Sequence, residues 1–241
     1  MRIVGMIPSR MASSRLPGKP LLDLCGKPMV QHVWEAAMRA SRLDQVVVAT
    51  PDREIVRAVQ AFGGDAVLTA DTHRSGTDRL AEAVVQLDAD AVVNIQGDEP
   101  LVLPGLIDAV AAPLAEPLVQ MVSLCCPAQE HEINEPSVVK AVVGSDGYAL
   151  YFSRAPIPYV RDASAGVIPR KHIGIYGYTR EVLLRLASLA PSPLEITESL
   201  EQLRALENGI RIRMVDVDAA PVGVDTADDL ARARAMLEQQ G

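Results

Sequence analysis

The sequence predicts an α/β fold, in which a mostly parallel sheet carries helices on both faces. Two observations lead to this prediction. Short apolar runs alternate with stretches of helical period along the chain, a pattern typical of βαβ units. With 49% hydrophobic and 22% charged residues in a length of 241, the chain can also bury a full core. This composition excludes disordered, collagen-like and membrane-spanning proteins.

The first half of the chain is expected to hold four strands and three helices. The apolar run after Arg2 predicts a first strand over 2–7, buried on both faces. A long polar loop then leads to a helix that begins at Pro28, whose apolar side chains recur three and four residues apart. Further strands are expected over 45–49, 66–68 and 91–95, and further helices over 52–62 and 77–87. Gly63 and Gly64 are expected to end the first of these two helices.

The second half mixes strands, loops and helices. Strands are expected over 120–125, 138–143, 148–152, 173–178 and 210–215, and helices over 179–189, 194–208 and 226–239. Residues 144–147 predict a hairpin turn, and Thr226 is suited to cap the last helix. Residues 155–171 contain three prolines and no clear period, which predicts a long surface loop. Because no segment has the composition of a linker, we expect a single domain over 1–241.

Charge is distributed unevenly along the chain. The net charge of −8 and a pI near 5.0 argue against a general nucleic-acid binder, and 3% aromatic residues are too few for a base-stacking surface. Residues 1–22 nevertheless contain Arg2, Arg10, Arg15 and Lys19 and no acidic residue. We therefore expect an anionic small molecule, and no nucleic acid, to bind near the start of the chain.

The cysteines and the apolar runs bear on location. Cys25, Cys125 and Cys126 offer neither an even disulfide framework nor metal-ligand spacing, which favours a reducing cytoplasm with buried thiols. No run approaches the roughly 18–20 apolar residues of a membrane span. We expect a cytoplasmic protein without a membrane partner.

The loop after the first strand has the composition of a polyphosphate site. It reads IPSRMASSRLPGKP over residues 7–20, and its cations, hydroxyls and backbone amides come from Arg10, Ser13, Ser14, Arg15, Gly18 and Lys19. In an open α/β sheet, ligands lie beyond the carboxyl ends of the strands, where this loop begins. It is not a Walker A loop, because Pro20 follows the lysine and the upstream glycine is missing. A solvated basic loop is the alternative interpretation.

Two acidic residues are candidates for a metal site. Asp98 follows a buried strand in NIQGDEP, and Gly97 before it would let the backbone approach a ligand. Mg²⁺ needs few protein oxygens, because it keeps substrate oxygens as ligands. Asp225, before the last helix, would supply a second carboxylate. An ordinary turn and a helix-start acid are the alternatives, and the sequence leaves open whether the two acids meet.

Two further clusters are suited to the rest of a nucleotide and to an acidic sugar. Residues 73–79, HRSGTDR, open a helix, and their hydroxyls and amides would bind a base or ribose, or only cap the helix. His172, Gly174, Tyr176 and Tyr178 alternate on one strand face, which either faces solvent or lines a pocket. Arg154 would pair with a substrate carboxylate. The polar side chains of the helix over 194–208, among them Glu201 and Gln202, would be mostly solvated.

Taken in order, these motifs resemble the 3-deoxy-manno-octulosonate cytidylyltransferases, or CMP-Kdo synthetases. The matching segments are IPSRMASSRLPGKPL, SGTDR, VNIQGDEP, GYALYFSRAPIP, HIGIYGY, LEQLR and GVDT. The resemblance implies a Rossmann-like nucleotidyltransferase sheet with a small mixed β extension around 120–205 for sugar binding and dimerisation. It also implies that CMP passes from CTP to Kdo with release of pyrophosphate, in lipopolysaccharide biosynthesis, with Mg²⁺ as cofactor and as a homodimer in the cytoplasm.

The resemblance further assigns residue roles. Arg10, Arg15 and Lys19 would hold the CTP phosphates together with Ser13 and Ser14, and Ser75, Gly76, Arg79 and Gln96 would lie around the cytidine. Asp98 and Asp225 would bind Mg²⁺, and with Arg15 and Lys19 would form the catalytic set. Arg154, His172, Tyr176, Glu201 and Gln202 would bind the sugar acid. The chain differs from many members at Ser9, where alanine is common, and in a shortened loop over 162–169.

Two alternatives of different kinds remain. A cytidylyltransferase acting on 8-amino-Kdo or a sialic acid would share the phosphate loop, because specificity would lie in the 154–202 pocket. A non-catalytic nucleotide-binding regulator would share the sheet. The presence of Lys19, Asp98 and Asp225 together argues against the regulator, since a binder needs fewer metal ligands.

Overall fold

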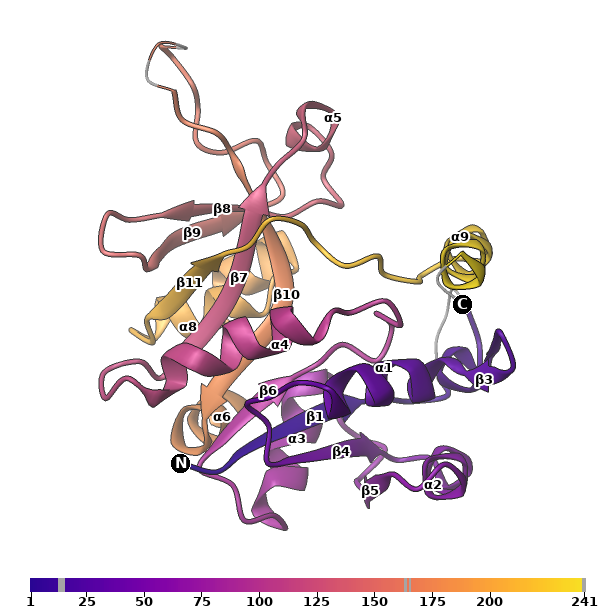
Figure 1. The fold of residues 1–241 in the computed structure, drawn as a ribbon. Coiled ribbons are helices and arrows are strands. Elements are labelled where there is room, and N and C mark those ends of the chain that lie inside the picture. Colours follow the sequence, from indigo (N-terminus) through magenta and orange to yellow (C-terminus); the bar gives the residue numbers. More distant parts are fainter. Residues whose placement is uncertain (13–15, 163, 165, 240–241) are drawn as a thin grey trace.

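A twisted mixed sheet organises the chain (Figure 1). The computed structural model describes residues 1–12, 16–162, 164 and 166–239. Over these residues the sheet has nine strands, seven of them in the order β11-β7-β10-β6-β1-β4-β5. Their bounds are β1 Ile3–Pro8, β4 Gln45–Thr50, β5 Asp65–Leu68, β6 Ala91–Asn94, β7 Met121–Pro127, β10 Arg170–Thr179 and β11 Ile212–Asp216.

Strand direction confirms the mostly parallel sheet. β1 pairs in parallel with β4 and β6, and β4 with β5. β10 is antiparallel to both of its neighbours, β6 and β7, so β7 and its parallel partner β11 run in the direction of β1. The strands of this order, apart from β10, therefore end at the same edge of the sheet, where ligands of α/β proteins bind.

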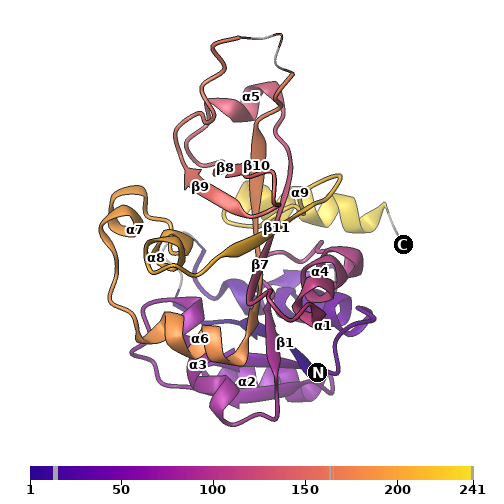
Figure 2. The ribbon, with the colours of Figure 1, turned by 90° about the vertical axis from the view of Figure 1, so that its left-hand side faces the viewer.

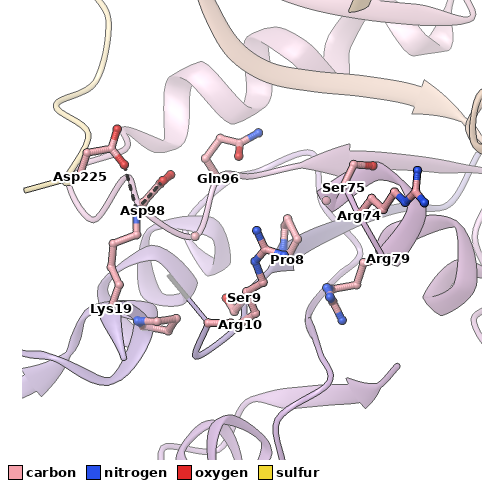
Figure 3. Close-up of a pocket in the computed structure, with 14 residues that line it drawn as sticks. Pro8, Ser9, Arg10, Lys19, Arg74, Ser75, Arg79, Gln96, Asp98 and Asp225 are labelled. Carbon is pink, nitrogen blue, oxygen red and sulfur yellow. Dashed lines mark hydrogen bonds and ion pairs between the residues drawn. The ribbon is translucent and has the colours of Figure 1, made fainter. Parts of the chain in front are cut away.

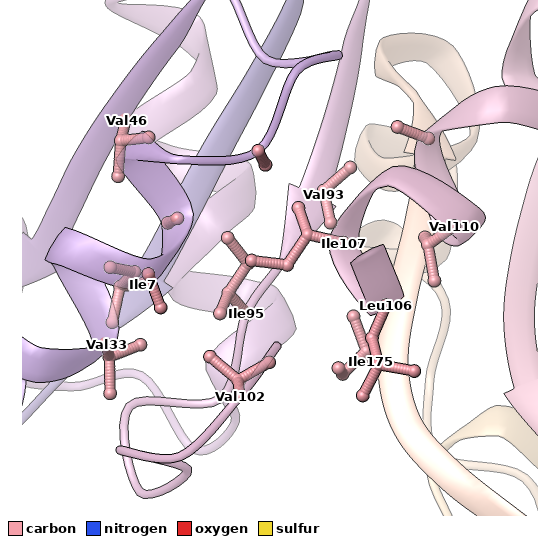
Figure 4. Packing of buried hydrophobic residues seen from close by; sticks show 14 of the residues in the cluster. Ile7, Val33, Val46, Val93, Ile95, Val102, Leu106, Ile107, Val110 and Ile175 are labelled. Atoms are coloured by element: carbon pink, nitrogen blue, oxygen red, sulfur yellow. The ribbon is translucent and has the colours of Figure 1, made fainter. Parts of the chain in front are cut away.

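Helices cover both faces, as the alternation of strands and helices predicts. α1 (Met29–Met38), α2 (Arg53–Ala61) and α4 (Pro104–Ala111) pack on one face, and α3 (Gly76–Val85), α6 (Arg180–Ser188) and α8 (Gln202–Glu207) on the other. In β1, Ile3 and Ile7 belong to the first core, and Val4 and Met6 to the second. Figure 4 shows the first core, where Ile107 of α4 lies beside Val93 of β6 and Ile95, which directly follows this strand.

A small β extension stands at one end of β7 and β10 (Figure 2). β8 (Lys140–Val143) pairs with the start of β10 and forms an antiparallel hairpin with β9 (Ala149–Ser153). Gly147 provides the left-handed turn residue of this hairpin, with φ 79°. α5 (Glu130–Ile133) belongs to the same extension, in agreement with the predicted mixed β segment.

Several expected elements differ from the structure. The helix expected over 194–208 is two helices, α7 (Pro193–Glu198) and α8, because Ser199 has a left-handed backbone with φ 52°. β10 begins at Arg170, within the segment expected to be loop. α4 was not predicted, since its sequence PGLIDAVA is apolar on nearly every side and shows little period. The other unpredicted elements are η1 (Lys19–Leu21), β2 (Asp23–Leu24), β3 (Lys27–Pro28), η2 (Ala112–Ala115) and α5.

The chain after β11 returns across the molecule to its beginning. Residues 217–226, here called the C-terminal strap, lead to α9 (Ala227–Glu238), which lies beside the β2–β3 hairpin (Figure 1). Val224 and Ala233 are buried there against Leu24 and Met29. Thr226 caps α9, as predicted, by accepting a hydrogen bond from Asp229 N. The strap therefore carries Asp225 back to the region of the first loop.

Two properties relate to the expected location. Cys125 and Cys126 are buried as expected, but Cys25 is exposed, because it occupies the left-handed turn of the β2–β3 hairpin with φ 54°. Among the helices that the structure describes, none has both the length and the hydrophobicity needed to cross a bilayer.

Candidate active site

A cleft of about 340 Å³ lies at the carboxyl ends of β1 and β6. Its walls come from the loop after β1, the start of α3, the turn after β6 and the C-terminal strap. Figure 3 shows Lys19 reaching between Asp98 and Asp225 on one side, with Arg74 and Arg79 on the other. The cleft is the position that the topology of the sheet predicts for a ligand.

One lysine and two carboxylates from distant parts of the sequence meet in this cleft. Lys19 Nζ donates to Asp98 Oδ2 at 2.8 Å, to Asp225 Oδ1 at 3.2 Å and to the Val224 carbonyl oxygen at 3.0 Å. The lysine side chain is 13% exposed, whereas those of Asp98 and Asp225 are 37% and 46% exposed. The two acids therefore present their oxygens to one point that remains open to the cleft.

Local structure fixes the position of Lys19. Gly18 has a left-handed backbone with φ 69°, and its N–H bonds to the Met11 carbonyl, which closes the loop on itself. Lys19 is the first residue of η1, and the next residue, Pro20, is buried. Met11 N also donates to Asp52 Oδ2 at 2.7 Å, which fastens the loop to the start of α2.

The turn after β6 holds Asp98 beside both the first loop and the strap. Val224 N donates to the Asp98 carbonyl oxygen at 2.8 Å, so the strap is fastened to the turn itself. A Cβ on Gly97 would lie 2.8 Å from the Pro8 carbonyl oxygen and 2.9 Å from Ser9 Oγ. Glycine is therefore required at position 97 for the turn to pack against the end of β1. The sequence alone suggests a different reason for this glycine, the approach of the backbone to a ligand.

The donor set fits a magnesium ion. Two carboxylates already surround one positive charge, the Lys19 ammonium, at hydrogen-bonding distance. Among the residues that the structure describes, no group of three or more His, Cys, Asp or Glu is arranged to hold a metal. A two-carboxylate site suits Mg²⁺, which completes its octahedral shell with water and phosphate oxygens, better than Zn²⁺ or Ca²⁺, which take more protein ligands.

Of the residues that the structure describes, three arginines line the cleft opposite or beside the acids. They are Arg10 from the loop after β1, Arg74 before α3 and Arg79 on α3. Arg79 Nη1 donates to Thr69 Oγ1 at 2.6 Å and to the Ala70 carbonyl at 3.1 Å. Burial, and next the positive charge of Arg10, lower the pKa of Arg79. An anionic ligand would reduce the repulsion between these positive charges.

The residues expected around the cytidine have structural partners as well. Ser75 is the N-cap of α3, where its hydroxyl accepts from Asp78 N and Asp78 completes a capping box. The capping interpretation of the HRSGTDR segment is therefore confirmed, and Ser75 also lines the cleft, whereas binding of a base or ribose stays a prediction. Gln96 Nε2 donates to the Gly174 carbonyl at 2.8 Å, which ties the turn after β6 to β10.

Two buried polar groups next to the cleft have no hydrogen-bond partner among the residues that the structure describes. They are the hydroxyl of Ser9 and Oε2 of Glu99. Burial, and next the charge of Asp98, raise the pKa of Glu99 to about 8. Glu99 is not among the described residues that line the cleft.

The residues expected to bind the sugar form a second group outside this cleft. The ring centroids of His172 and Tyr176, both on β10, are 5.5 Å apart. Burial raises the pKa of Tyr176 well above its ordinary value, as does the nearby charge of Glu201. A second cavity of about 600 Å³ has Glu201 on its wall and shares Arg74 and Ser75 with the cleft. Of the five residues expected to bind the sugar, Glu201 therefore lines a cavity that adjoins the cleft, and among the described residues the other four line neither cavity.

The other polar residues of this group are held by the protein itself. Arg154 donates from Nε to the Glu198 carbonyl at 2.7 Å, from Nη1 to the Pro136 carbonyl at 3.0 Å and from Nη2 to the Ser199 carbonyl at 3.3 Å. Gln202 is buried at the start of α8, so the expectation that it is solvated is wrong. Glu201 accepts a hydrogen bond from Thr77 Oγ1 rather than facing only solvent.

The sequence predictions and the structure do not cover the same residues of the site. Ser13, Ser14 and Arg15 lie outside the described residues. Arg74 lines the cleft but was not singled out, although a cation directly before a helix N-cap, after a strand of the parallel sheet, is a signal for it. Ser9 also lines the cleft, and no sequence signal distinguishes its buried hydroxyl from a loop serine.

Replacing Gly97 by alanine is expected to destabilise the protein by about 1–3 kcal/mol, because the new Cβ would overlap the Pro8 carbonyl. We expect the melting temperature to fall by about 5 °C. Gly105→Ala is the matched control. A Cβ on Gly105 meets nothing within 4 Å, and alanine favours its helix, so this variant should melt at or above the wild-type temperature. Equal melting of the two variants would contradict the packing argument.

Comparison with known proteins agrees with the geometry. The family model described as Cytidylyltransferase matches residues 4–212. The 3-deoxy-manno-octulosonate cytidylyltransferase of Geobacter sulfurreducens is 48% identical over 99% of this chain and 100% of its own length. That of Pseudomonas fluorescens is 53% identical over 97% of each chain. A solved CMP:2-keto-3-deoxy-manno-octonic acid synthetase complexed with CTP has a TM-score of 0.96 and 46% identity, covering 100% of both chains.

These relatives match the chain over its whole length, so the likeness includes the cleft, the extension and the C-terminal strap alike. A nucleotidyl transferase from Methanothermobacter thermautotroptrophicus, with 16% identity and a TM-score of 0.66, shares the fold. The chain belongs to the 3-deoxy-manno-octulosonate cytidylyltransferase family of nucleotidyltransferases.

Proposed function

We propose that this protein transfers CMP from CTP to the anomeric hydroxyl of 3-deoxy-D-manno-octulosonate (Kdo), giving CMP-Kdo and pyrophosphate for lipopolysaccharide biosynthesis. The convergence of Lys19, Asp98 and Asp225 in a cleft lined by arginines is the observation that carries the proposal. Carboxylates for a metal and cations for a polyphosphate are the two requirements of nucleotidyl transfer from a triphosphate.

Within this proposal, the anomeric oxygen attacks the α-phosphorus of CTP in line with the leaving pyrophosphate. The new O–P bond forms as the α–β phosphoanhydride bond breaks, and the hydroxyl proton is released. Asp98 and Asp225 would hold Mg²⁺, which would supply positive charge to the phosphate oxygens. Lys19, Arg10 and Arg15 would bind and orient the triphosphate, and the main effects of the protein would be positioning and charge stabilisation.

The proposed binding residues follow the two neighbouring groups of the structure. Ser75, Gly76, Arg79 and Gln96 would lie around the cytidine, which is supported by their place in the wall of the cleft. Arg154, His172, Tyr176, Glu201 and Gln202 would surround the sugar acid. The bond from Gln96 to the Gly174 carbonyl links the two groups across β6 and β10. Ser13 and Ser14 would add hydroxyls to the phosphate loop.

A pyrophosphate-release assay tests the proposal. With Mg²⁺ and CTP, we expect release on addition of Kdo, and at least about tenfold lower kcat/KM when UTP or ATP replaces CTP. Parallel reactions with 8-amino-Kdo and N-acetylneuraminate test the sugar specificity. If none of these sugar acids caused pyrophosphate release, the proposal would be contradicted and a nucleotide-binding regulator would be favoured. Equal rates with CTP, UTP and ATP would contradict the cytidine site.

The same proposal extends to the domain organisation, the oligomeric state and the cellular location of the protein. We propose one nucleotidyltransferase domain over 1–241, with the segment around 120–205 serving sugar binding and formation of a homodimer. Exposed apolar side chains on the extension support the dimer, since Leu150, Tyr159 and Ile168 are 63%, 88% and 63% exposed. Because the reaction uses a nucleoside triphosphate, we propose that it takes place in the cytoplasm.

A further inference from the structure

The proposed sugar side of the site contains a β-bulge in β10, and one buried hydroxyl lies within hydrogen-bonding distance of two of its backbone carbonyls. In the pairing of β10 with β7, Ile173 is opposite Leu124 and Tyr176 is opposite Ser123, so Gly174 and Ile175 have no partner on β7. A bulge of this kind leaves backbone groups without ladder bonds and redirects the neighbouring side chains. Tyr176 directly follows the bulge, and His172 precedes it by one residue, Ile173.

Ser123 compensates for the bulge from the β7 side. It is 0% exposed, and its Oγ lies 3.1 Å from the Ile173 carbonyl oxygen and 3.0 Å from the Ile175 carbonyl oxygen. From the β6 side, Gln96 Nε2 donates to the Gly174 carbonyl between them. The three consecutive carbonyls of the bulge are thus held by two side chains, one on each neighbouring strand.

The same hydroxyl lies 2.9 Å from His172 Nε2. A serine hydroxyl has one proton to donate, and both carbonyl oxygens can only accept. If Nε2 were also an acceptor, three acceptors would compete for one proton. The arrangement is satisfied when the Ser123 proton points to the bulge carbonyls and Nε2–H donates to Ser123 Oγ.

We propose that Ser123 is a positioning residue that holds His172 in its Nε2–H tautomer, so that Nδ1 is a hydrogen-bond acceptor for a hydroxyl group of the sugar acid. The role given to the sugar rests on the proposed function, whereas the tautomer does not. In this arrangement His172 does not donate to the substrate carboxylate, which needs a cationic or N–H partner elsewhere in the site. Ring contacts with Phe152 at 4.9 Å and Tyr176 at 5.5 Å restrict the orientation of the imidazole.

The electrostatic surroundings agree with a neutral ring. Burial lowers the pKa of His172 to about 3, so the imidazole carries one proton at neutral pH. Its side chain is nevertheless partly exposed, and its backbone N–H is already bonded to the Val139 carbonyl at 2.8 Å. Since Nε2 is directed at Ser123 of β7, the acceptor is Nδ1, the ring nitrogen on the other side of Cε1.

The tautomer is measurable in the free protein by long-range ¹H–¹⁵N correlation with ¹⁵N-labelled histidine. The chain has four histidines, so His172→Gln assigns the signal. We expect Nε2 of His172 to have the shift of a protonated nitrogen and Nδ1 that of an unprotonated one. In Ser123→Ala this preference should be lost, and in Ser192→Ala, which removes another buried hydroxyl that donates to Glu207, it should be unchanged. An Nδ1–H tautomer in the wild-type protein would overturn the proposal.

Kinetics test the contact with the sugar. Ser123→Ala should raise KM for Kdo about tenfold, the effect of one misplaced hydrogen bond, and leave KM for CTP within about twofold. An unchanged KM for CTP also shows that this variant folds. His172→Gln keeps an N–H for Ser123 but has no acceptor at the Nδ1 position, so KM for Kdo should rise equally. Normal KM values for Kdo in both variants would overturn the proposal, whereas a wild-type protein without turnover would contradict the proposed function and leave the tautomer result valid.

Discussion

Replacement of Asp98 by asparagine is expected to lower Mg²⁺-dependent pyrophosphate release from CTP and Kdo by at least about 10³-fold, or about 4 kcal/mol in the barrier. The substitution keeps the shape of the side chain and an oxygen that accepts from Lys19 Nζ, now 2.8 Å away. It removes one of the two negative charges that face this point in the cleft. Activity should therefore fall while the melting temperature stays close to that of the wild type.

The measurement is a coupled pyrophosphate assay over a range of Mg²⁺ concentrations, with thermal melting of the same preparations. Asp88→Asn provides the matched control, because its side chain is 92% exposed and makes only a 3.7 Å contact with Arg2. This variant should retain full activity. Near-normal release by Asp98→Asn at wild-type Mg²⁺ concentrations would show that Asp98 is not a metal ligand.

The largest effect on stability is expected from Arg204→Met. Arg204 and Glu195 form a buried ion pair, with side chains 7% and 12% exposed. Arg204 Nε donates to Glu195 Oε2 at 2.8 Å, and a second bond joins Nη2 and Oε1. Methionine would fill the space but leave a carboxylate without its cation, which costs about 3–5 kcal/mol in the free energy of unfolding. The melting temperature should fall by about 10 °C.

This loss should depend on pH in a defined direction. Burial alone would raise the pKa of Glu195, but the hydrogen bonds from Arg204 and Ser192 N and the charge of Arg204 outweigh it and lower the pKa. A carboxyl group with a lowered pKa in the folded state adds stability above its unfolded pKa, and this stability is lost as the pH falls through the folded value. The difference between wild type and variant is therefore full at neutral pH and shrinks under acidic conditions.

Urea unfolding at several pH values measures the effect. Arg232→Met is the control, because Arg232 is 70% exposed in its pair with Asp229 and surface pairs contribute about 0–1 kcal/mol. If Arg204→Met were no less stable than this control at neutral pH, the buried pair would not be a main source of stability in the α7–α8 region.

Much of the fold could be predicted because its signals are local. The buried strands around β1 and β6 are continuous apolar runs, and the start of α9 is signalled by Thr226 with an acid three residues later. The break between α7 and α8 was not predictable in this way. It depends on carbonyls at Glu198 and Ser199 that accept from Arg154, a residue about 45 positions earlier in the chain.

The candidate site shows the same division. The composition of the first loop identified Lys19, and the turn after a buried strand identified Asp98, since each signal lies within a few residues. The meeting of these residues with Asp225 could not be derived, because it depends on the packing of α9 against Leu24 and Met29. The tautomer of His172 was equally hidden, since it depends on which β7 residue faces the bulge. The functional roles of these residues remain predictions.

The ion-paired cluster also has a consequence for the protein during its synthesis. Lys19 bonds to residues 79 and 206 positions later, so its partners emerge from the ribosome at very different times. A nascent chain that extends past Asp98 but ends before residue 225 contains Lys19 and Asp98 but lacks the second carboxylate, Asp225. Truncated products of this kind would thus retain strands of the sheet without a complete set of acids, and the proposed chemistry would begin only in chains that have been translated past residue 225.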